Sequence, residues 1–86
     1  MVTSGWTSVG TAATLIDGRH NQATYLTIHN NDNTDAVYIG DSNVTTTTGL
    51  KLNKEESYQF ILQPLDQIFA VSSKAGHNIS WMRQTV

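Results

Sequence analysis

The segment A-T-Y-L-T-I-H-N at residues 23–30 decides the fold class of this chain. Leu26 and Ile28 point to one side, while Tyr25 and the polar residues that alternate with them point to the other, as side chains do along a β-strand. The amide- and carboxylate-rich run at 30–35 follows directly, and such residues favour tight turns. The segment therefore predicts a half-buried strand that ends in a polar turn.

The same pattern recurs along the rest of the chain. Runs rich in Thr, Val, Ile and aromatic residues are separated by Gly, Asn and Asp clusters, which is typical of a sandwich of short strands. The expected strands span residues 11–17, 23–30, 36–40, 50–52, 57–63, 67–73 and 78–83. Asp17-Gly18 is expected to turn the chain, and Met1–Gly10 to form an extended N-terminal arm or an edge strand anchored by Trp6.

We therefore expect an all-β protein, a small antiparallel β-sandwich or flattened barrel of about seven short strands with an extended N-terminal arm. Residues 11–86 would form a single β-sandwich domain behind the arm or edge strand at 1–10. A domain of 86 residues has a thin core, and the chain contains no cysteine to add a disulfide. Association with a partner is then the expected source of extra stability.

Charge excludes several classes of partner. Charged residues make up 14% of the chain and the net charge is −2, so the basic footprint of a nucleic-acid or membrane-surface protein is missing. No apolar run approaches the roughly 20 residues of a membrane helix. We expect neither nucleic acid nor a membrane as partner, and instead a neutral surface suited to contact with protein or sugar.

No arrangement of reactive residues indicates catalysis, a metal or a cofactor. His20, His29 and His77 fall at predicted turns or strand ends and are expected to be solvated. The cluster at 31–35 resembles a calcium loop but lacks the turn glycine and the final glutamate, so an Asx-rich turn is favoured. No serine sits in a glycine-flanked elbow, and the acidic residues lie in different turns. The chain is expected not to be an enzyme.

Candidate contact residues come from the N-terminal arm, with Trp6 as its anchor, and from two further features. Tyr25 and Tyr38 lack apolar neighbours on their own strand face, so they are expected on an outer face, where Tyr and Trp act as contact anchors or sugar platforms. The Thr-rich loop at 43–49 has no alternation to bury, and is expected to be mobile or ordered by a neighbour. The candidate protein-contact residues are Trp6, Tyr25, Tyr38, Val44, Thr45, Thr46 and Thr47.

From Tyr25 onward, a series of strand and turn motifs resembles the small β-sandwich virion proteins of tailed bacteriophages. The motifs are T-I-H-N at 27–30, V-Y-I-G at 37–40, Val44-Thr45, G-L-K-L at 49–52, Tyr58 with Leu62, and I-F-A-V-S at 68–72. Met1–His20 lies outside the resemblance. The family pattern has a turn glycine where this chain has Glu55, and glutamate tolerates positive φ poorly, so a different type of turn is expected there.

The resemblance implies a capsid decoration, or cement, protein. Such a protein would be made in the host cytoplasm, bind the major capsid protein on the outer surface of the phage head, and bridge its subunits. A homo-oligomer is expected, with a trimer as the natural form because closed oligomers cover exposed edges. The alternatives are a host-surface or glycan-binding module such as a head fibre, and a structural component of the tail or neck.

Overall fold

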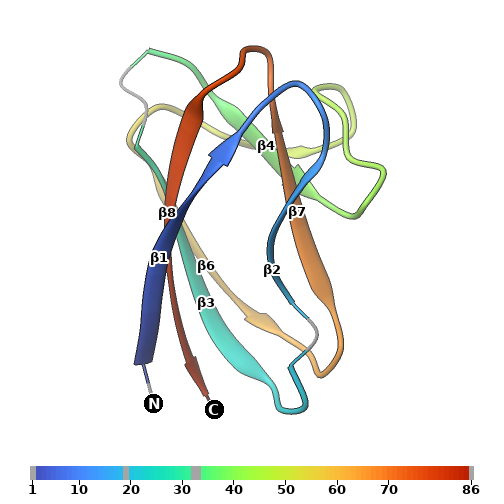
Figure 1. Cartoon of the computed structure of the whole chain (residues 1–86), viewed down its shortest axis with the longest axis vertical. Coiled ribbons are helices and arrows are strands. Elements are labelled where there is room, and N and C mark those ends of the chain that lie inside the picture. The colour runs from blue at the N-terminus through green and yellow to red at the C-terminus, as the bar shows by residue number, and fades with distance from the viewer. Residues whose placement is uncertain (1, 19, 32–33, 86) are drawn as a thin grey trace.

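The computed structural model describes residues 2–18, 20–31 and 34–85 and contains eight strands. None of these residues belongs to a helix long and apolar enough to cross a membrane. The strands are β1 (Val2–Val9), β2 (Thr14–Gly18), β3 (Thr24–Asn30), β4 (Val37–Gly40), β5 (Leu50–Leu52), β6 (Ser57–Leu62), β7 (Gln67–Ser72) and β8 (His77–Thr85). They form two four-stranded sheets, and both termini lie at the same end of the molecule (Figure 1).

The strands are ordered β1-β8-β3-β6 in one sheet and β2-β7-β4-β5 in the other, and all neighbours are antiparallel. Only β4 and β5 are neighbours in both sequence and sheet, because every other connection crosses between the sheets. This interleaved order is that of an eight-stranded jelly roll. The predicted all-β sandwich is confirmed, with two sheets in place of the flattened barrel that was the alternative.

The core lies between the two sheets, and every strand contributes to it. Leu26 and Ile28 are fully buried, as their alternation predicted. Val9 of β1 and Ile79 of β8 are also fully buried beside them. The remaining members of the core are Ile16, Val37, Ile39, Leu52, Leu62 and Ala70. Packing therefore fixes one face of each strand and leaves the opposite face as the surface on which a function can lie.

The N-terminal segment accounts for the eighth strand. Residues 2–9 pair with β8 along their whole length, from Val2 opposite Gln84 to Val9 opposite His77. Of the two forms expected for this segment, the structure has the edge strand and not a free arm. The expectation of a turn at Asp17-Gly18 is wrong, since both residues belong to β2 after a bulge, and the Asp17 side chain is buried.

The turn between β5 and β6 also differs from the expectation. Glu55 has a φ of 58°, so the turn keeps the left-handed backbone that a glycine would favour, with glutamate in its place. The backbone N–H of Glu56 donates to the Asn53 carbonyl, and the Glu56 carboxylate accepts from the Asn53 N–H at 2.7 Å. These two bonds close the turn and hold Glu55 in its strained conformation.

Candidate functional site

The predicted contact residues lie on two opposite faces of the sandwich. Trp6 and Tyr25 point outward from the β1-β8-β3-β6 sheet, and Trp6 is 68% exposed. Tyr38 points outward from β4 in the other sheet and is partly buried. The loop that carries Val44 to Thr47 packs beside Tyr38. The seven residues therefore do not form one site.

The Thr-rich loop is ordered by its own chain. Val44 is 5% exposed, and its side chain lies against Gly40 and Gly49, where any added Cβ would come within 3 Å of it. The Thr45 hydroxyl accepts bonds from the backbone N–H groups of Thr47 and Thr48, and the Gly49 N–H donates to the Thr45 carbonyl. The loop thus covers part of the outward side of the β2-β7-β4-β5 sheet, and the Val44 side chain packs against the sheet and not into solvent.

The other sheet has no such cover from the described part of the chain, and its outward side chains form what we call the outer face. The outer face consists of Val2, Ser4, Trp6 and Ser8 of β1; Asn78, Ser80, Met82 and Gln84 of β8; Tyr25, Thr27 and His29 of β3; and Ser57, Gln59 and Ile61 of β6. Strand register sets them in rows across the sheet. One row runs Val2, Gln84, Tyr25, Ile61, and the next runs Ser4, Met82, Thr27, Gln59.

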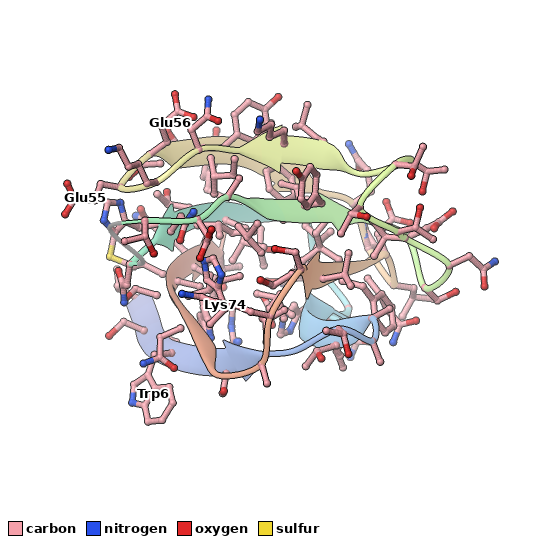
Figure 2. All side chains as sticks on the ribbon, turned by 90° about the horizontal axis from the view of Figure 1, so that it is seen from above. Trp6, Glu55, Glu56 and Lys74 are labelled. Atoms are coloured by element: carbon pink, nitrogen blue, oxygen red, sulfur yellow. The ribbon has the colours of Figure 1, made fainter. Side chains whose placement is uncertain are left out.

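The outer face combines exposed apolar side chains with an absence of charge. Met82 is 49% exposed and Ile61 50%, and Trp6 projects away from the rest of the molecule (Figure 2). Not one of the outward residues of these four described strands is Lys, Arg, Asp or Glu. Depletion of charge with enrichment of Trp, Tyr and Met is the composition found at the centre of protein–protein interfaces.

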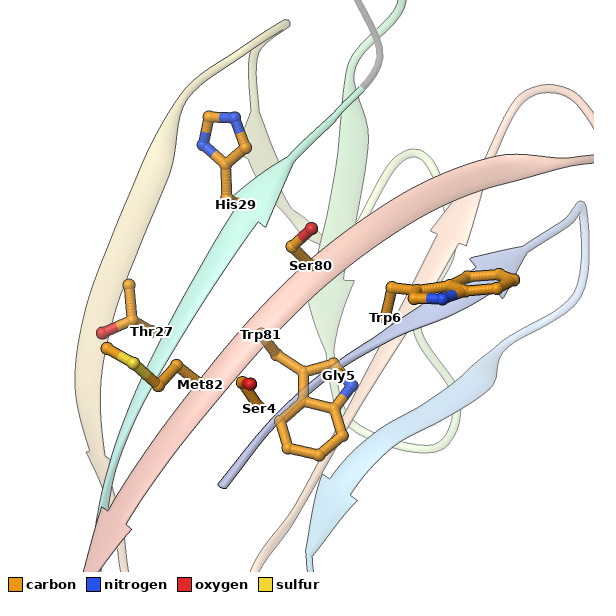
Figure 3. Close-up of a pocket in the computed structure, with 8 residues that line it drawn as sticks. All are labelled: Ser4, Gly5, Trp6, Thr27, His29, Ser80, Trp81 and Met82. Carbon is orange, nitrogen blue, oxygen red and sulfur yellow. The ribbon is translucent and has the colours of Figure 1, made fainter. Parts of the chain in front are cut away.

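A hollow of about 440 Å³ lies in the outer face (Figure 3). Trp6 on β1 stands on one side of β8, and His29 on β3 stands on the other side, with Ser80 and Met82 of β8 between them. The alternation of β3 and β8 predicts an outward direction for His29 and Met82, but their meeting with Trp6 depends on strand order. Sequence reasoning therefore missed Met82 and the hollow.

Trp81 holds the strand that carries Trp6 in place. It pairs with Gly5 across β1 and β8, and a Cβ on Gly5 would lie 2.8 Å from the Trp81 ring. The indole N–H donates to the Thr7 hydroxyl at 3.3 Å, and the Arg83 guanidinium lies 5.3 Å from the ring centroid. The glycine thus admits the ring against the β1 backbone, and these contacts fix the edge strand from the inner side.

The expectation that all three histidines are solvated is wrong. His77 is fully buried at the start of β8. His20 is partly buried, and its Nε2–H donates to the Asp17 carboxylate at 2.8 Å. His29 is partly exposed and lies 2.7 Å from the Ser57 hydroxyl across β3 and β6. In the turn predicted at 31–35, Asp32 and Asn33 lie outside the described residues.

Ser72, His77 and Asn30 form a buried chain of hydrogen bonds that sequence reasoning did not find. The Ser72 hydroxyl lies 2.9 Å from His77 Nδ1, and His77 Nε2 lies 2.6 Å from Asn30 Oδ1. The Asn30 amide nitrogen donates to three backbone carbonyls, which assigns its oxygen as the acceptor from His77. The proton of a neutral His77 therefore sits on Nε2, and Ser72 donates to Nδ1.

The three residues are of the types found in a catalytic triad, with a serine nucleophile, a histidine base and an amide that orients the base. The serine hydroxyl, however, is not accessible to a substrate. Ser72 is 1% exposed and the other two members are fully buried, so no substrate can reach the hydroxyl. A nucleophile must contact its substrate. The chain of bonds instead joins the turns after β3, β5 and β7 at one end of the sandwich, because Asn30 reaches the carbonyls of Asp35, Leu52 and Asn53.

A charged cluster fills the opposite end of the sandwich. The Asp17 carboxylate accepts from Arg83 at 2.9 Å and contacts His20, and it is the most buried of the three side chains. Asp17 Oδ2 and the Thr24 hydroxyl are buried with no partner among the described residues. No group of three or more His, Cys, Asp or Glu in the described ranges is placed to hold a metal ion. The pair links β2 to β8 across the core and serves the packing of the sheets.

An apolar cleft of about 330 Å³ opens between the edge strands β5 and β6. Leu50 lines it from one sheet and Phe60 from the other, with Tyr58 beside Phe60 at 5.7 Å between ring centroids. Leu50 and Tyr58 are exposed although their positions point inward, because the sheets separate at this side. Tyr58 and Phe60 share a face of β6 because side chains alternate along the strand, whereas the opening above them depends on how the two sheets separate.

Comparison with known proteins adds one structural similarity. No family model and no curated protein matches the chain. A solved structure from the work "Bacillus endospore appendages form a novel family of disulfide-linked pili" superposes with a TM-score of 0.64 at 14% identity, over all of this chain and 86% of that chain. This likeness confirms the all-β fold, and the similar structure belongs to disulfide-linked pili that are endospore appendages.

Proposed function

We propose that this chain is a structural subunit that works by non-covalent contact with other protein in a repeated surface assembly. The observation that carries the proposal is the outer face, where Trp6, Met82, Tyr25 and Ile61 are exposed with no charge among them. A contiguous apolar surface of this composition marks an interaction site. The mechanism is passive, since burial of this surface stabilises the assembled state.

Two independent features support an assembly role. The similar structure comes from pili, which are built from repeated subunits, and it covers the whole of this chain. The motifs at 27–30, 37–40 and 68–72 resemble those of small phage virion proteins. Of the assemblies open to a structural subunit, the resemblance favours capsid decoration, with the major capsid protein as partner on the outer surface of the phage head. In that role, many symmetric copies multiply a modest contact.

The experiment is to follow the native chain through fractionation of its source on a density gradient. The proposal expects the chain in a high-mass particle fraction at many copies per particle, counted by quantitative mass spectrometry. For capsid decoration, the copy number would follow the number of capsid subunits, and antibody labelling would mark the head. A chain found only in the fraction of free small proteins would refute the structural role.

A glycan-binding module is the second candidate, and the hollow favours it. An exposed aromatic ring, Trp6, lies beside the polar side chains of His29 and Ser80, which is a combination able to stack on and hydrogen-bond to a sugar. A glycan array probed with the wild-type chain and with Trp6→Ala tests it. Binding that depends on Trp6 would favour this candidate over capsid decoration, whereas an array without signal would leave the structural proposal in place.

A further inference from the structure

We propose that the outer face pairs with the outer face of a second copy of this chain, about a two-fold axis that runs along β8. The inference deepens the proposed function by naming one partner surface, and it rests on that function only for its biological setting. The pairing places Met82 of one copy against Met82 of the other. It also places Trp6 of each copy in the hollow of its partner.

Charge selects a second copy as the occupant. In a two-fold contact each patch meets itself, so a charged residue near the axis faces its own charge, which is destabilising. The chain has twelve charged residues, five basic and seven acidic, yet none of those in the described strands points out from β1, β8, β3 or β6. A partner of opposite charge would instead require a charged face. An uncharged face fits a copy of itself.

Strand order supplies the complementary shapes. β8 lies between β1 and β3, so rotation about an axis along β8 carries Trp6 from the β1 side of one copy to the β3 side of the other. The hollow extends from Trp6 across β8 to that side, where His29 borders it, with Ser80 and Met82 between them (Figure 3). Trp6 lies on β1, one strand or about 4.8 Å to one side of β8. The rotation carries it the same distance to the other side, where its projecting ring lies over the hollow of the partner copy. The face thus carries both the projection and the depression that receives it.

The size of the face is that of a small specific interface. The molecule measures 33 × 23 × 16 Å, and four strands about 4.8 Å apart span only the shortest of these dimensions, so the outline of the face is 33 × 16 Å, or about 530 Å² (Figure 1). Two such faces together bury about 1,060 Å², just above the roughly 1,000 Å² that a specific interface should reach. The outward side of the β2-β7-β4-β5 sheet is already covered in part by the loop that contains Val44. It also carries a charge, because the Lys51 side chain points out from β5 beside Tyr38. The outer face is therefore the one that can supply the required area without a charge.

The test is a charge swap at the axis. Met82→Lys and Met82→Glu each keep a long unbranched side chain at a position that is about half exposed, so both variants should fold. Mass is measured by light scattering after size exclusion at about 100 µM, well above micromolar dissociation constants. The wild-type chain of 9.5 kDa should run as a dimer. Each variant alone should be a monomer, because like charges then meet, and an equal mixture of the two should recover the dimer.

Two further variants locate the contact. Trp6→Ala should give a monomer, because it removes the ring that enters the partner's hollow. Thr46→Lys places the same new charge as Met82→Lys on the exposed loop of the opposite face, and should remain a dimer. Circular dichroism confirms that each variant is folded.

The pairing is overturned if the wild-type chain is monomeric or trimeric, if Met82→Lys leaves the mass unchanged, or if the mixed variants stay monomeric. Trp6-dependent glycan binding by a monomer would also overturn it. A monomer that is nevertheless found in a native particle would refute the pairing and leave the structural role standing. A dimer that never appears in a native particle would support the pairing and refute the structural role.

Discussion

Replacement of Asn30 by alanine should cause a large loss of stability. Asn30 is fully buried, and its amide nitrogen donates to the carbonyls of Asp35, Leu52 and Asn53 at 3.0 to 3.1 Å. Its oxygen accepts from His77 at 2.6 Å. Alanine keeps the β3 backbone but removes every one of these contacts. The buried groups that bonded to Asn30 then lose this partner, and water cannot replace it without opening the end of the sandwich.

The magnitude follows from the number of buried groups affected. A buried polar group that loses its partner costs about 1–3 kcal/mol. The His77 ring N–H and the Leu52 carbonyl are the two most enclosed, so we expect Asn30→Ala to lower the free energy of unfolding by about 4 kcal/mol. A domain of 86 residues has a total stability of roughly 4–13 kcal/mol, so this one change removes a large share of it.

The assay is urea unfolding followed by tryptophan fluorescence and far-ultraviolet circular dichroism. Asn78→Ala is the matched control, because Asn78 is an exposed strand residue of β8, and its loss should stay within about 0.5 kcal/mol. If Asn30→Ala proves too unstable to purify, Ser72→Ala removes the hydroxyl that donates to His77 and accepts from the Lys74 N–H, and should cost about 1–2 kcal/mol. A loss below about 1 kcal/mol for Asn30→Ala, or one equal to that of the control, would refute the reasoning.

Three other substitutions test separate parts of the fold. Val44→Ala should lower the free energy of unfolding by about 2 kcal/mol and make the loop at 41–49 sensitive to protease, because it removes buried methyl groups that hold the loop down. Gly5→Ala should cost about 1–3 kcal/mol and alter the near-ultraviolet circular dichroism of Trp81, whose ring lies 2.8 Å from the new Cβ. Glu55→Gly should raise the free energy of unfolding by about 0.5–1 kcal/mol, because glycine relieves the strain of the positive φ. Glu56→Gly should lower it by a similar amount, because the bond from the Asn53 N–H to the Glu56 carboxylate is lost. If thermal melts show shifts of the same sign for both variants, the roles given to Glu55 and Glu56 in the turn are wrong.

Local pattern was enough to predict the strands because alternation is a property of each strand by itself. Leu26 and Ile28 are buried and Tyr25 is exposed, as the segment at 23–30 predicted. The same reasoning placed six further strands close to their observed bounds. It was less decisive at residues 1–10, where Ser, Thr and Gly give little apolar alternation and the strand is held mainly by its pairing with β8.

Strand order could not be predicted because most of it depends on contacts between distant parts of the chain. Asn30 and His77 are 47 residues apart and meet only because the jelly roll brings β3 and β8 side by side. Trp6 and Met82 are further apart still, and share the hollow for the same reason. The prediction of a turn at Asp17 failed in a related way, since a distant Arg83 stabilises its buried carboxylate within a strand.

The outer face is informative because its apolar side chains contribute little to the fold of a single copy. Trp6 is 68% exposed and Met82 about half exposed, so polar residues at these positions would leave the core between the sheets intact. An exposed apolar face also increases the risk of aggregation. The chain has no cysteine, so the disulfide linkage named for the similar pili is not open to it. A contact made by this chain would therefore not be a disulfide bond, and the outer face is the uncharged surface with exposed apolar side chains that the described fold offers for such a contact.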